Sequence, residues 1–495
     1  MPIFRAHCAM RAAPPTPAGQ TVPGPTGGGG RALAVAQGVR FVVRAGGAMG
    51  LARLLAPADY GRFGMAAIVY GLLFLVRDLG AGAAVPQPGL TPAQFRAMCR
   101  FGVIGGLVIG LVCAATGPIA AWFYAEPRLT LLLAALALAF PFAGAAAPRV
   151  ALCYREGHAG RAALIDTVAL LGSTLLAVAA AFAGAGAWAL VLLAVAGEVI
   201  TCALAVRLCP WHSDTADAAP LPWRRLLGFG AQLSVHNVAQ YFQRASDQIV
   251  VGRVAGADAL GVYGRGVQAT ALPAQFTVAP FTAWIVAELA RVAGDGLAYR
   301  ARFRALLNGV MHLTLPAAAV CVAVPELVVG VLFGERWAGA VPVVRWLGLG
   351  LALQPWLFVP TWLLISSGRT RRLALLGLLG LVITAVAVWS QRQGAGEQMA
   401  QAMAVAALVV AATTVPLAVA ASPAAMGDVV TASARPLILN VGLGLVLAAA
   451  QHAGRPTLGG QLGVAVGAAL LYLGLAFTVA KGVRREWLGH FLWRA

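Results

Sequence analysis

Two apolar segments of the chain carry polar side chains at helical spacing, and both include arginine. In the first segment, Gln37, Arg40 and Arg44 are three and four residues apart, so they lie on one face of a helix. The polar residues of the second segment are His236, Asn237, Gln240, Gln243, Arg244 and Asp247. Arginine stays charged at any relevant pH, and its planar fork donates two hydrogen bonds to a phosphate. Together the two stripes favour a phosphate-bearing ligand over a cationic one.

A polar stripe on a membrane helix is expensive when it faces lipid, so we expect both stripes to face a shared central cavity. A structural role is the alternative for each arginine. Arg244 could pair with Asp247, three residues later on the same face. Arg44 could reach an acidic residue on a neighbouring helix, and Arg40 could extend its charged group to the membrane surface.

Three further ionisable residues are candidates for a gate or for energy coupling. Arg77 and Asp78 end a predicted apolar span, where they either form an ion-pair gate or cap the helix. Glu198 lies inside another apolar span. Burial favours the neutral form of a carboxyl group, so Glu198 could take up a coupling proton. A hydrogen bond to a neighbouring helix is the other interpretation.

The composition indicates an integral membrane protein that carries these residues on transmembrane helices. Of the 495 residues, 60% are hydrophobic and 11% are charged, whereas soluble proteins have roughly 25% charged residues. About 20 apolar residues span a bilayer, and this criterion predicts an all-α polytopic protein with about 14 spans. The segment 259–290 contains two prolines and is predicted to be one kinked helix. The spans begin near residues 33, 63, 101, 129, 162, 187, 227, 259, 305, 341, 373, 399, 436 and 461.

Residues 33–64 and 233–264 align without a gap, which indicates an internal repeat. Identical residues at the same offset include the following pairs: Arg44 and Arg244, Arg53 and Arg253, Gly61 and Gly261, and Gly64 and Gly264. Chance matching in a narrow composition is the alternative, but arginine and glycine matches are harder to obtain by chance than alanine or leucine matches. Two repeats of six spans enter the membrane in the same direction. A pseudo-twofold axis along the membrane normal is therefore expected, with two C-terminal spans outside the repeat.

The predicted organisation follows from these spans and from the proline-rich connection between the two repeats. The predicted parts are a disordered tail (1–30), an N-lobe (31–207), a cytoplasmic linker (208–226), a C-lobe (227–421), two further spans (435–481) and a cytoplasmic tail (482–495). The N-terminal tail lacks a continuous apolar core, so we do not expect it to be a cleaved signal peptide. Most of the 36 lysines and arginines fall on one side of the spans, which predicts that both termini are cytoplasmic.

The same patterns exclude several classes of function. The net charge of +19 is spread over short loops and forms no single patch, so we predict no nucleic-acid partner. The sequence contains no phosphate-binding Walker loop, no HExxH motif and no long loop for a catalytic domain. We therefore predict neither an enzyme nor a cofactor. The seven cysteines are interpreted as small apolar packing residues, with neither a disulfide framework nor a metal site.

Three motifs in this order resemble the Wzx-type lipopolysaccharide and polysaccharide exporters of the multidrug/oligosaccharidyl-lipid/polysaccharide exporter superfamily. Residues 51–91 resemble the family's N-terminal turn and the apolar span that ends in a "DLG" element, here Asp78, Leu79 and Gly80. Residues 245–275 resemble its central region, and residues 331–349 resemble its "L-x-G-x-x-W" stretch. The N-terminal tail has no family counterpart that we can place.

This resemblance implies a two-lobed flippase in the bacterial inner membrane that works by alternating access. Its partner would be an undecaprenyl-pyrophosphate-linked oligosaccharide, a precursor of O-antigen or exopolysaccharide. Arg44, Arg244 and Arg40 would bind the pyrophosphate, and the remaining polar residues of both stripes would contact the sugars. A proton, a sodium ion or the membrane potential could drive transport, and a polysaccharide polymerase and chain-length proteins are candidate partners.

Four functions compete at this stage. The first is export of a lipid-linked glycan, and the second is cation-coupled multidrug export within the same superfamily. A drug exporter would prefer acidic residues in its cavity, where arginines dominate in this sequence. A lipid II flippase would share the fold and differ in cargo. A membrane glycan polymerase or ligase would need a long outer loop with catalytic residues. The predicted spans leave no room for such a loop.

Overall fold

The computed structural model describes residues 27–77, 92–156, 158–209, 223–391, 394 and 396–452, together with Gly463, Gly467 and Tyr472. Every regular element among these residues is a helix, so the predicted all-α fold is confirmed. Most of the predicted N-terminal tail, most of the linker between the lobes, and the C-terminal tail lie outside the described residues. The first described helix starts at Gly27, within the last residues of the predicted tail.

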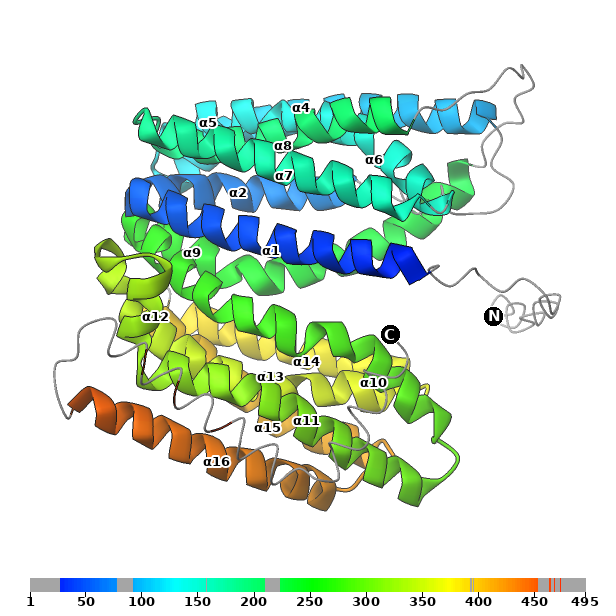
Figure 1. Ribbon diagram of the computed structural model, residues 1–495, viewed down its shortest axis with the longest axis vertical. Helices are drawn as coiled ribbons and strands as arrows, with labels where there is room; N and C mark the ends of the chain where they lie inside the picture. Colours follow the sequence, from blue (N-terminus) through cyan, green and yellow to red (C-terminus); the bar gives the residue numbers. More distant parts are fainter. Residues whose placement is uncertain are drawn as a thin grey trace, which may run out of the picture.

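The two halves of the chain form two helical bundles, which are the upper and lower parts of Figure 1. In the N-lobe, the described helices are α1 (Gly27–Leu54), α2 (Pro57–Arg77), α4 (Pro92–Tyr124), α5 (Leu129–Ala137), α6 (Ala139–Arg155), α7 (Ala159–Phe182) and α8 (Ala187–Leu208). In the C-lobe they are α9 (Trp223–Thr277), α10 (Ala279–Arg291), α11 (Gly296–Ala323), α12 (Pro325–Leu332), η1 (Glu335–Ala340), α13 (Val341–Ser366), α14 (Thr370–Ser390) and α15 (Gly396–Ala420). Helix α16 (Met426–His452) packs against α11.

Local sequence explains where several of these helices begin. Prolines at the first or second position open α10, α12 and α13, where a missing backbone N–H costs nothing. Asp295 caps α11, because its carboxylate accepts hydrogen bonds from the backbone N–H groups of Leu297 and Ala298. Such a cap satisfies N–H groups that have no partner within the helix.

Nine described helical segments are long and apolar enough to cross a membrane, by length and composition. Helices α1, α2 and α9 are not among them, and these helices carry most of the polar and charged residues singled out above. Each predicted span up to residue 452 falls on described helices, and the spans from about residues 129 and 259 are each divided between two of them. The fourteenth predicted span, from about residue 461, lies almost wholly outside the described residues. The chain is a multi-pass membrane protein.

Helix α9 includes one predicted span and the start of the next, separated by a kink at Gly256. This residue has a φ of 81°, a conformation that glycine adopts without the steric cost of a Cβ atom. The residue 200 positions earlier, Ala56, lies in the break between α1 and α2, so the two repeats turn at the same point. The segment 259–290 is not one continuous helix, because it breaks at Val278, between α9 and α10. Pro280 follows two residues later, in the first turn of α10, where proline is tolerated.

Helix packing within the two lobes follows one pattern. In the N-lobe, α4 packs against α6, α6 against α8, and α7 against α8. In the C-lobe, α11 packs against α13, α13 against α15, and α14 against α15. The third, fourth, fifth and sixth spans of each half are therefore arranged alike, as expected for a six-span repeat.

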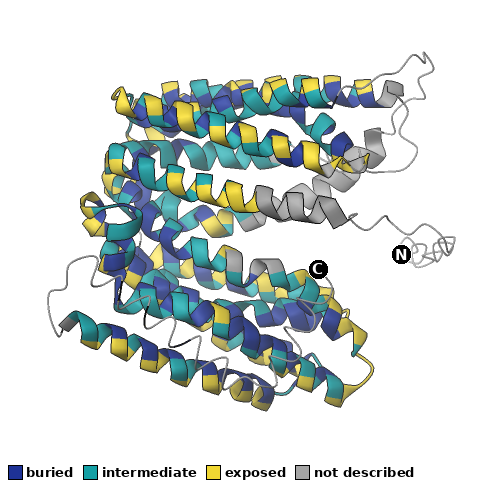
Figure 2. Ribbon diagram, viewed as in Figure 1, coloured by how far each residue is buried: buried dark blue, intermediate teal, exposed yellow. Residues whose placement is uncertain are grey.

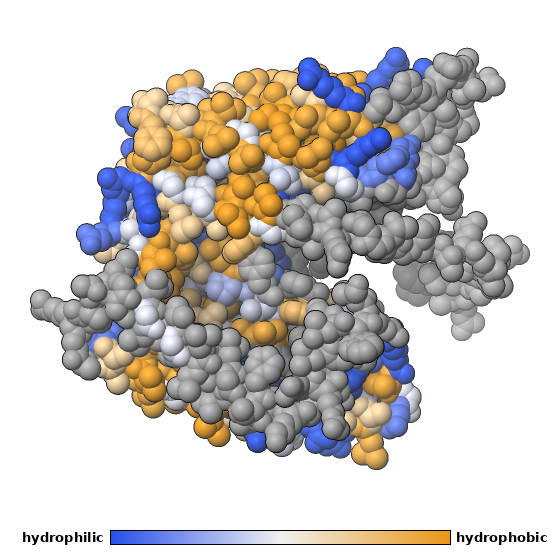
Figure 3. All heavy atoms as spheres, viewed as in Figure 1, coloured by the Kyte–Doolittle hydropathy of each residue, from blue (hydrophilic) through white to orange (hydrophobic). Residues whose placement is uncertain are grey.

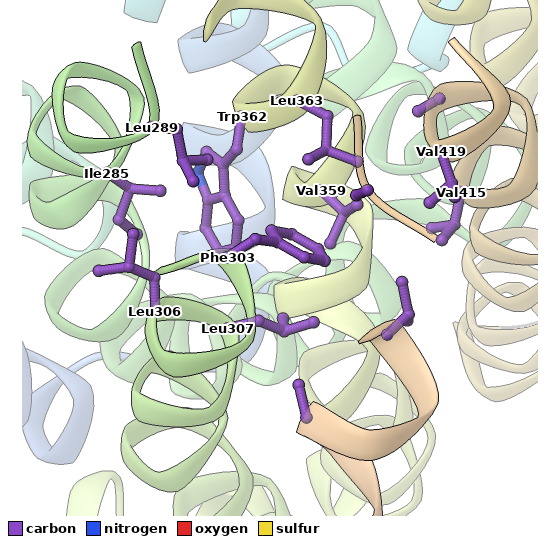
Figure 4. Packing of buried hydrophobic residues seen from close by; sticks show 14 of the residues in the cluster. Ile285, Leu289, Phe303, Leu306, Leu307, Val359, Trp362, Leu363, Val415 and Val419 are labelled. Atoms are coloured by element: carbon purple, nitrogen blue, oxygen red, sulfur yellow. The ribbon is translucent and has the colours of Figure 1, made fainter. Parts of the chain in front are cut away.

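Each lobe has an apolar interior and an apolar outer surface. In the C-lobe, α10, α11, α13 and α15 converge on a core that includes the fully buried Phe303 and Trp362 (Figure 4). Exposed residues follow the outward faces of the helices (Figure 2), and many of them are large and apolar, such as Leu111, Trp122 and Ile438. Figure 3 shows a broad orange, apolar surface on the N-lobe. Such a surface suits contact with acyl chains.

The prediction that no cysteine forms a disulfide is wrong for one pair. Cys153 at the end of α6 and Cys209 directly after α8 are disulfide-bonded, with their Cα atoms 6.2 Å apart. The two cysteines are 56 residues apart along the chain, and sequence spacing could not reveal that the ends of α6 and α8 meet. Four other cysteines among the described residues are free, and three of these are buried, in line with the packing role assigned to them.

Candidate functional site

The lobes meet at the end of the bundle that contains the α1–α2 break and the kink of α9. We call this the closed end. Helix α2 packs closely along α9, and two glycines make this approach possible. A methyl group added at Gly61 would overlap the carbonyl oxygen of Ala257, and one added at Gly261 would overlap the carbonyl oxygen of Pro57. All four residues form repeat-equivalent pairs, so the contact is symmetric about the pseudo-twofold axis.

Aromatic side chains surround this glycine contact. Trp337 of η1 is fully buried, and its indole N–H donates to the backbone oxygen of Ala52 in the N-lobe at 2.7 Å. Its ring also meets Tyr60 edge to face, with the ring centroids 5.3 Å apart. A single hydrophobic cluster includes these residues from both lobes, with Leu55 and Phe333. The closed end is therefore sealed by packed apolar side chains.

Arg265 lies buried in this seal, and the sequence analysis did not single it out. Its guanidinium lies 3.6 Å from the ring centroid of Tyr60 and 5.6 Å from that of Trp337, and it donates a hydrogen bond to Gln268. No carboxylate among the described residues pairs with it. A buried cation that pairs with no described carboxylate, between the lobes of a membrane protein, indicates a functional residue. The signal that could have revealed it was a lone arginine in the apolar segment after the kink.

Two repeat-equivalent arginines flank the closed end, and each reaches across to the other lobe. Arg53 at the end of α1 donates to the backbone oxygen of Val331 in α12 at 3.2 Å. Arg253 lies over the ring of Phe123 in α4, 5.7 Å from its centroid. Both arginines are exposed, so these contacts are worth little individually. Their symmetry supports the alignment of the two repeats.

The arginines of the first stripe lie in different surroundings. Arg40 forms an ion pair with Asp166 of α7, with a nitrogen–oxygen distance of 2.8 Å. This pair lies on the side of α1 that packs against α7, where Gly47 also contacts Thr174. Arg44, one turn further along, is exposed, as is Gln37. Arg40 thus anchors its own helix, whereas Arg44 pairs with no carboxylate among the described residues.

The second stripe divides in a similar way. Arg244 is exposed and does not pair with Asp247 or with any other described carboxylate, so the alternative of an Arg244–Asp247 pair is not realised. Asp247 is instead buried, and it accepts a hydrogen bond from the hydroxyl of Tyr263 at 2.7 Å, across the kink of α9. Gln243 is half-buried, and the side chains of His236, Asn237 and Gln240 lie outside the described residues.

A contact next to this stripe joins α9 to the N-lobe. The hydroxyl of Tyr241 donates to the backbone oxygen of Ile68 in α2 at 2.7 Å. Its ring also lies directly against Gly71, where a Cβ atom would come within 2.7 Å of the hydroxyl oxygen. This contact lies further along α2 than Gly61, away from the closed end. The first segment of α9 is thus held against α2.

The gate and coupling candidates remain predictions. The guanidinium of Arg77 lies over the ring of Phe74, 4.0 Å from its centroid, at the end of α2. Asp78 lies outside the described residues, so an ion pair between these neighbours is not tested. Glu198 is half-buried on α8.

The ion pair of Arg40 gives a test of how α1 is held. We expect Asp166→Asn to destabilise the protein by about 1–3 kcal/mol, because it removes the charged partner of a partly buried guanidinium. Asp166 is itself more than a third exposed, which favours the lower part of that range. Thermal unfolding in detergent measures the effect. The charge swap Arg40→Asp/Asp166→Arg should recover part of the loss, and equal instability of the swap would contradict a pairwise role.

Comparison with known proteins agrees with this architecture. Residues 50–342, more than half of the chain, match the family described as "Polysaccharide biosynthesis protein". The chain is 23% identical over 307 residues to the lipopolysaccharide biosynthesis protein WzxC of Escherichia coli (strain K12), covering 60% of each protein. It is 23% identical over 305 residues to the teichuronic acid biosynthesis protein TuaB of Bacillus subtilis (strain 168), covering 60% of this chain and 62% of TuaB. The matched region thus spans about three fifths of these relatives.

Two solved structures share the fold. The lipid II flippase MurJ in an inward closed conformation superposes with a TM-score of 0.69 at 10% identity, covering 90% of this chain and 98% of MurJ. An inward-facing multidrug resistance transporter of the MATE family superposes with a TM-score of 0.58 at 13% identity, covering 78% and 97% of the two chains. Both likenesses concern the fold. The family match agrees with the resemblance found in the three sequence motifs, and the chain belongs to the polysaccharide biosynthesis protein family.

Proposed function

We propose that this protein translocates a lipid-linked oligosaccharide or polysaccharide precursor across the bacterial inner membrane by alternating access. The observation that carries the proposal is the pair of exposed arginines on repeat-related membrane helices. Arg44 and Arg244 pair with no described carboxylate, so both guanidinium groups can bind a pyrophosphate. Membership of the polysaccharide biosynthesis family supports a glycan as the cargo.

In this proposal the head group reaches Arg44 and Arg244 from the end of the bundle opposite the closed end. Gln37 and Gln243 contact sugar hydroxyls, together with His236, Asn237 and Gln240. Arg40 is assigned a supporting role, because its ion pair with Asp166 holds α1 against α7. Asp247 is likewise assigned to the kink of α9, because it is buried against Tyr263. The lipid tail stays in the bilayer while the head group crosses.

Arg265 is a second phosphate contact in this proposal. Tyr60 covers its guanidinium while the closed end is sealed. When the lobes separate there, the ring withdraws and leaves a cation that an anionic head group can compensate. The phosphate would thus pass from Arg44 and Arg244 to Arg265 during the transport cycle. The phosphate would thus bind Arg265 in the open state but not in the sealed state. Such a difference in binding between two states is what a ligand needs to shift a conformational equilibrium.

The charge distribution supports one orientation. The ends of the helices opposite the closed end carry Arg291, Arg300, Arg302, Arg304 and Arg369, and basic residues concentrate on the cytoplasmic side of membrane proteins. The closed end then faces the periplasm, and both termini are cytoplasmic. Transport involves no covalent chemistry in this proposal. A proton, a sodium ion or the membrane potential drives it, with Arg77, Asp78 and Glu198 as candidates for coupling.

Replacement of the two cavity arginines tests the proposal. We expect Arg44→Ala and Arg244→Ala each to reduce surface polysaccharide by about tenfold or more, as expected when an interaction of about 1.4 kcal/mol or more is lost. The variants would be expressed in the native host from which the gene has been deleted. Surface glycan and membrane-inserted protein would both be quantified.

Arg207→Ala is the matched control, because Arg207 is an exposed arginine at the end of α8, outside both stripes. This variant should export normally. Accumulation of the lipid-linked precursor on the cytoplasmic side would place the block at translocation. Normal export by both cavity variants at normal protein levels would remove the assignment of the site.

A further inference from the structure

We propose that Gly61 and Gly261 form the gate of the closed end, and that one added methyl group at either position prevents the gate from closing. This inference rests on the proposed function, because alternating access requires the closed end to open and close. The geometry of the gate is independent of the cargo. The argument starts from the four residues in the contact, which are Gly61, Ala257, Gly261 and Pro57.

The contact is self-complementary. Gly61 of one repeat lies against Ala257 of the other, and Gly261 lies against Pro57, the residue equivalent to Ala257. In both cases the neighbouring atom is a backbone carbonyl oxygen. A side chain could rotate away from a new methyl group, but a backbone oxygen moves only with its helix. A Cβ atom at either glycine would therefore push α2 and α9 apart.

The next pair of repeat-equivalent glycines shows that this tightness is local. A Cβ atom at Gly64 would meet only the side chain of Leu260, at 3.5 Å, which is ordinary van der Waals contact. At Gly264, no atom lies within 4 Å of such a Cβ. All four glycines lie in the same region of the repeat, so the second pair supplies matched controls for the first.

The surroundings of the contact allow it to open as a unit. The lobes are joined here by apolar packing around Leu55, Tyr60 and Trp337, and by hydrogen bonds such as those of Arg53 and Trp337 to backbone oxygens. Among the described residues, no ion pair crosses between the lobes at this contact. Packed interfaces have discrete closed and open arrangements, so a displacement at the two glycines changes the state of the whole closed end.

Accessibility of a buried reporter measures the state of this gate. Leu55 is 2% exposed in the sealed cluster, so Leu55→Cys in a variant without the seven native cysteines is the reporter. A membrane-impermeant maleimide would be added to right-side-out and to inside-out vesicles. We expect Gly61→Ala and Gly261→Ala to raise labelling from one side by about tenfold, which corresponds to a shift of about 1.4 kcal/mol in the open–closed equilibrium. Gly64→Ala and Gly264→Ala should leave the reporter protected.

Two outcomes of this experiment overturn the inference. One is full protection of the reporter in membrane-inserted Gly61→Ala and Gly261→Ala. The other is equally strong labelling in Gly264→Ala. Labelling needs no substrate, so a positive result stands even if the cavity arginines prove unnecessary for glycan export.

A cross-link tests the same gate without altering Gly61 or Gly261, should the alanine variants fail to insert. Gly64→Cys and Leu260→Cys place two thiols on facing helices within reach of each other. We expect oxidation to link the lobes and stop export, and a reductant to restore export. Failure of the link to form, or normal export by the linked protein, contradicts a gate at this position.

Discussion

Replacing Arg265 with methionine is expected to stabilise the protein and abolish export. The guanidinium is buried with no described carboxylate partner, and Tyr60, Trp337 and Gln268 supply its contacts. A desolvated cation–π contact contributes about 2 kcal/mol, whereas burying an ion costs several kcal/mol. The buried guanidinium therefore destabilises the sealed state. An apolar side chain of similar length would avoid this desolvation and stabilise the protein.

The expected gain is about 1–4 kcal/mol, by analogy with buried ion pairs that are replaced by well-packed apolar residues. Thermal unfolding in detergent measures stability, and surface polysaccharide measures export. Arg265→Lys keeps the charge but loses the planar fork, and it should retain part of the export activity. If Arg265→Met instead lowers stability and still exports, Arg265 is a structural contact and not a phosphate contact.

Truncation of Trp337 is expected to open the closed end. The side chain is fully buried between the lobes, and its loss removes the packing against Tyr60 and the hydrogen bond to Ala52. Replacing a buried tryptophan with alanine lowers the free energy of unfolding by about 3–5 kcal/mol. The Leu55→Cys reporter should then become accessible in Trp337→Ala, while the protein remains inserted.

Two variants separate this effect from general destabilisation. Trp337→Phe keeps an aromatic ring and loses the hydrogen bond, a change of about 0.5–1.5 kcal/mol, so the reporter should be labelled much less. Trp362 is equally buried, but it lies within the core of the C-lobe (Figure 4). Trp362→Ala should lower stability and leave the reporter protected. Equal labelling in Trp337→Ala and Trp362→Ala would mean that Trp337 has no special role in the seal.

Periodicity and composition were sufficient to predict most of the fold. Spans of about 20 apolar residues can only be helices in a bilayer, so their positions are readable without tertiary information. The repeat was equally readable, because Gly61 and Gly261 match at a fixed offset. Their role was not readable. Glycine in a membrane helix indicates close packing, but it does not identify the neighbouring backbone, which here belongs to the other repeat.

The roles of the site residues remain predictions, but the surroundings of their side chains could not be read from the sequence. Helical spacing placed Arg40 and Arg44 on one face of a helix, but one face is broad enough to contact two environments. Arg40 meets Asp166 on α7, 126 residues away along the chain, while Arg44 is exposed. Asp247 was grouped with the cavity residues, and its hydrogen bond to Tyr263 depends on the bend at Gly256.

The amino-acid sequence by itself determined that this protein is a helical membrane protein built from two similar halves, because insertion in lipid depends on local hydropathy and length. The tertiary structure decided which charges are paired and which are available. A guanidinium binds a phosphate more readily when no carboxylate already occupies its donors, and that depends on side chains brought together from distant helices. For the same reason, only the packed lobes revealed Arg265 beneath Tyr60 and the symmetric contact of Gly61 with Gly261.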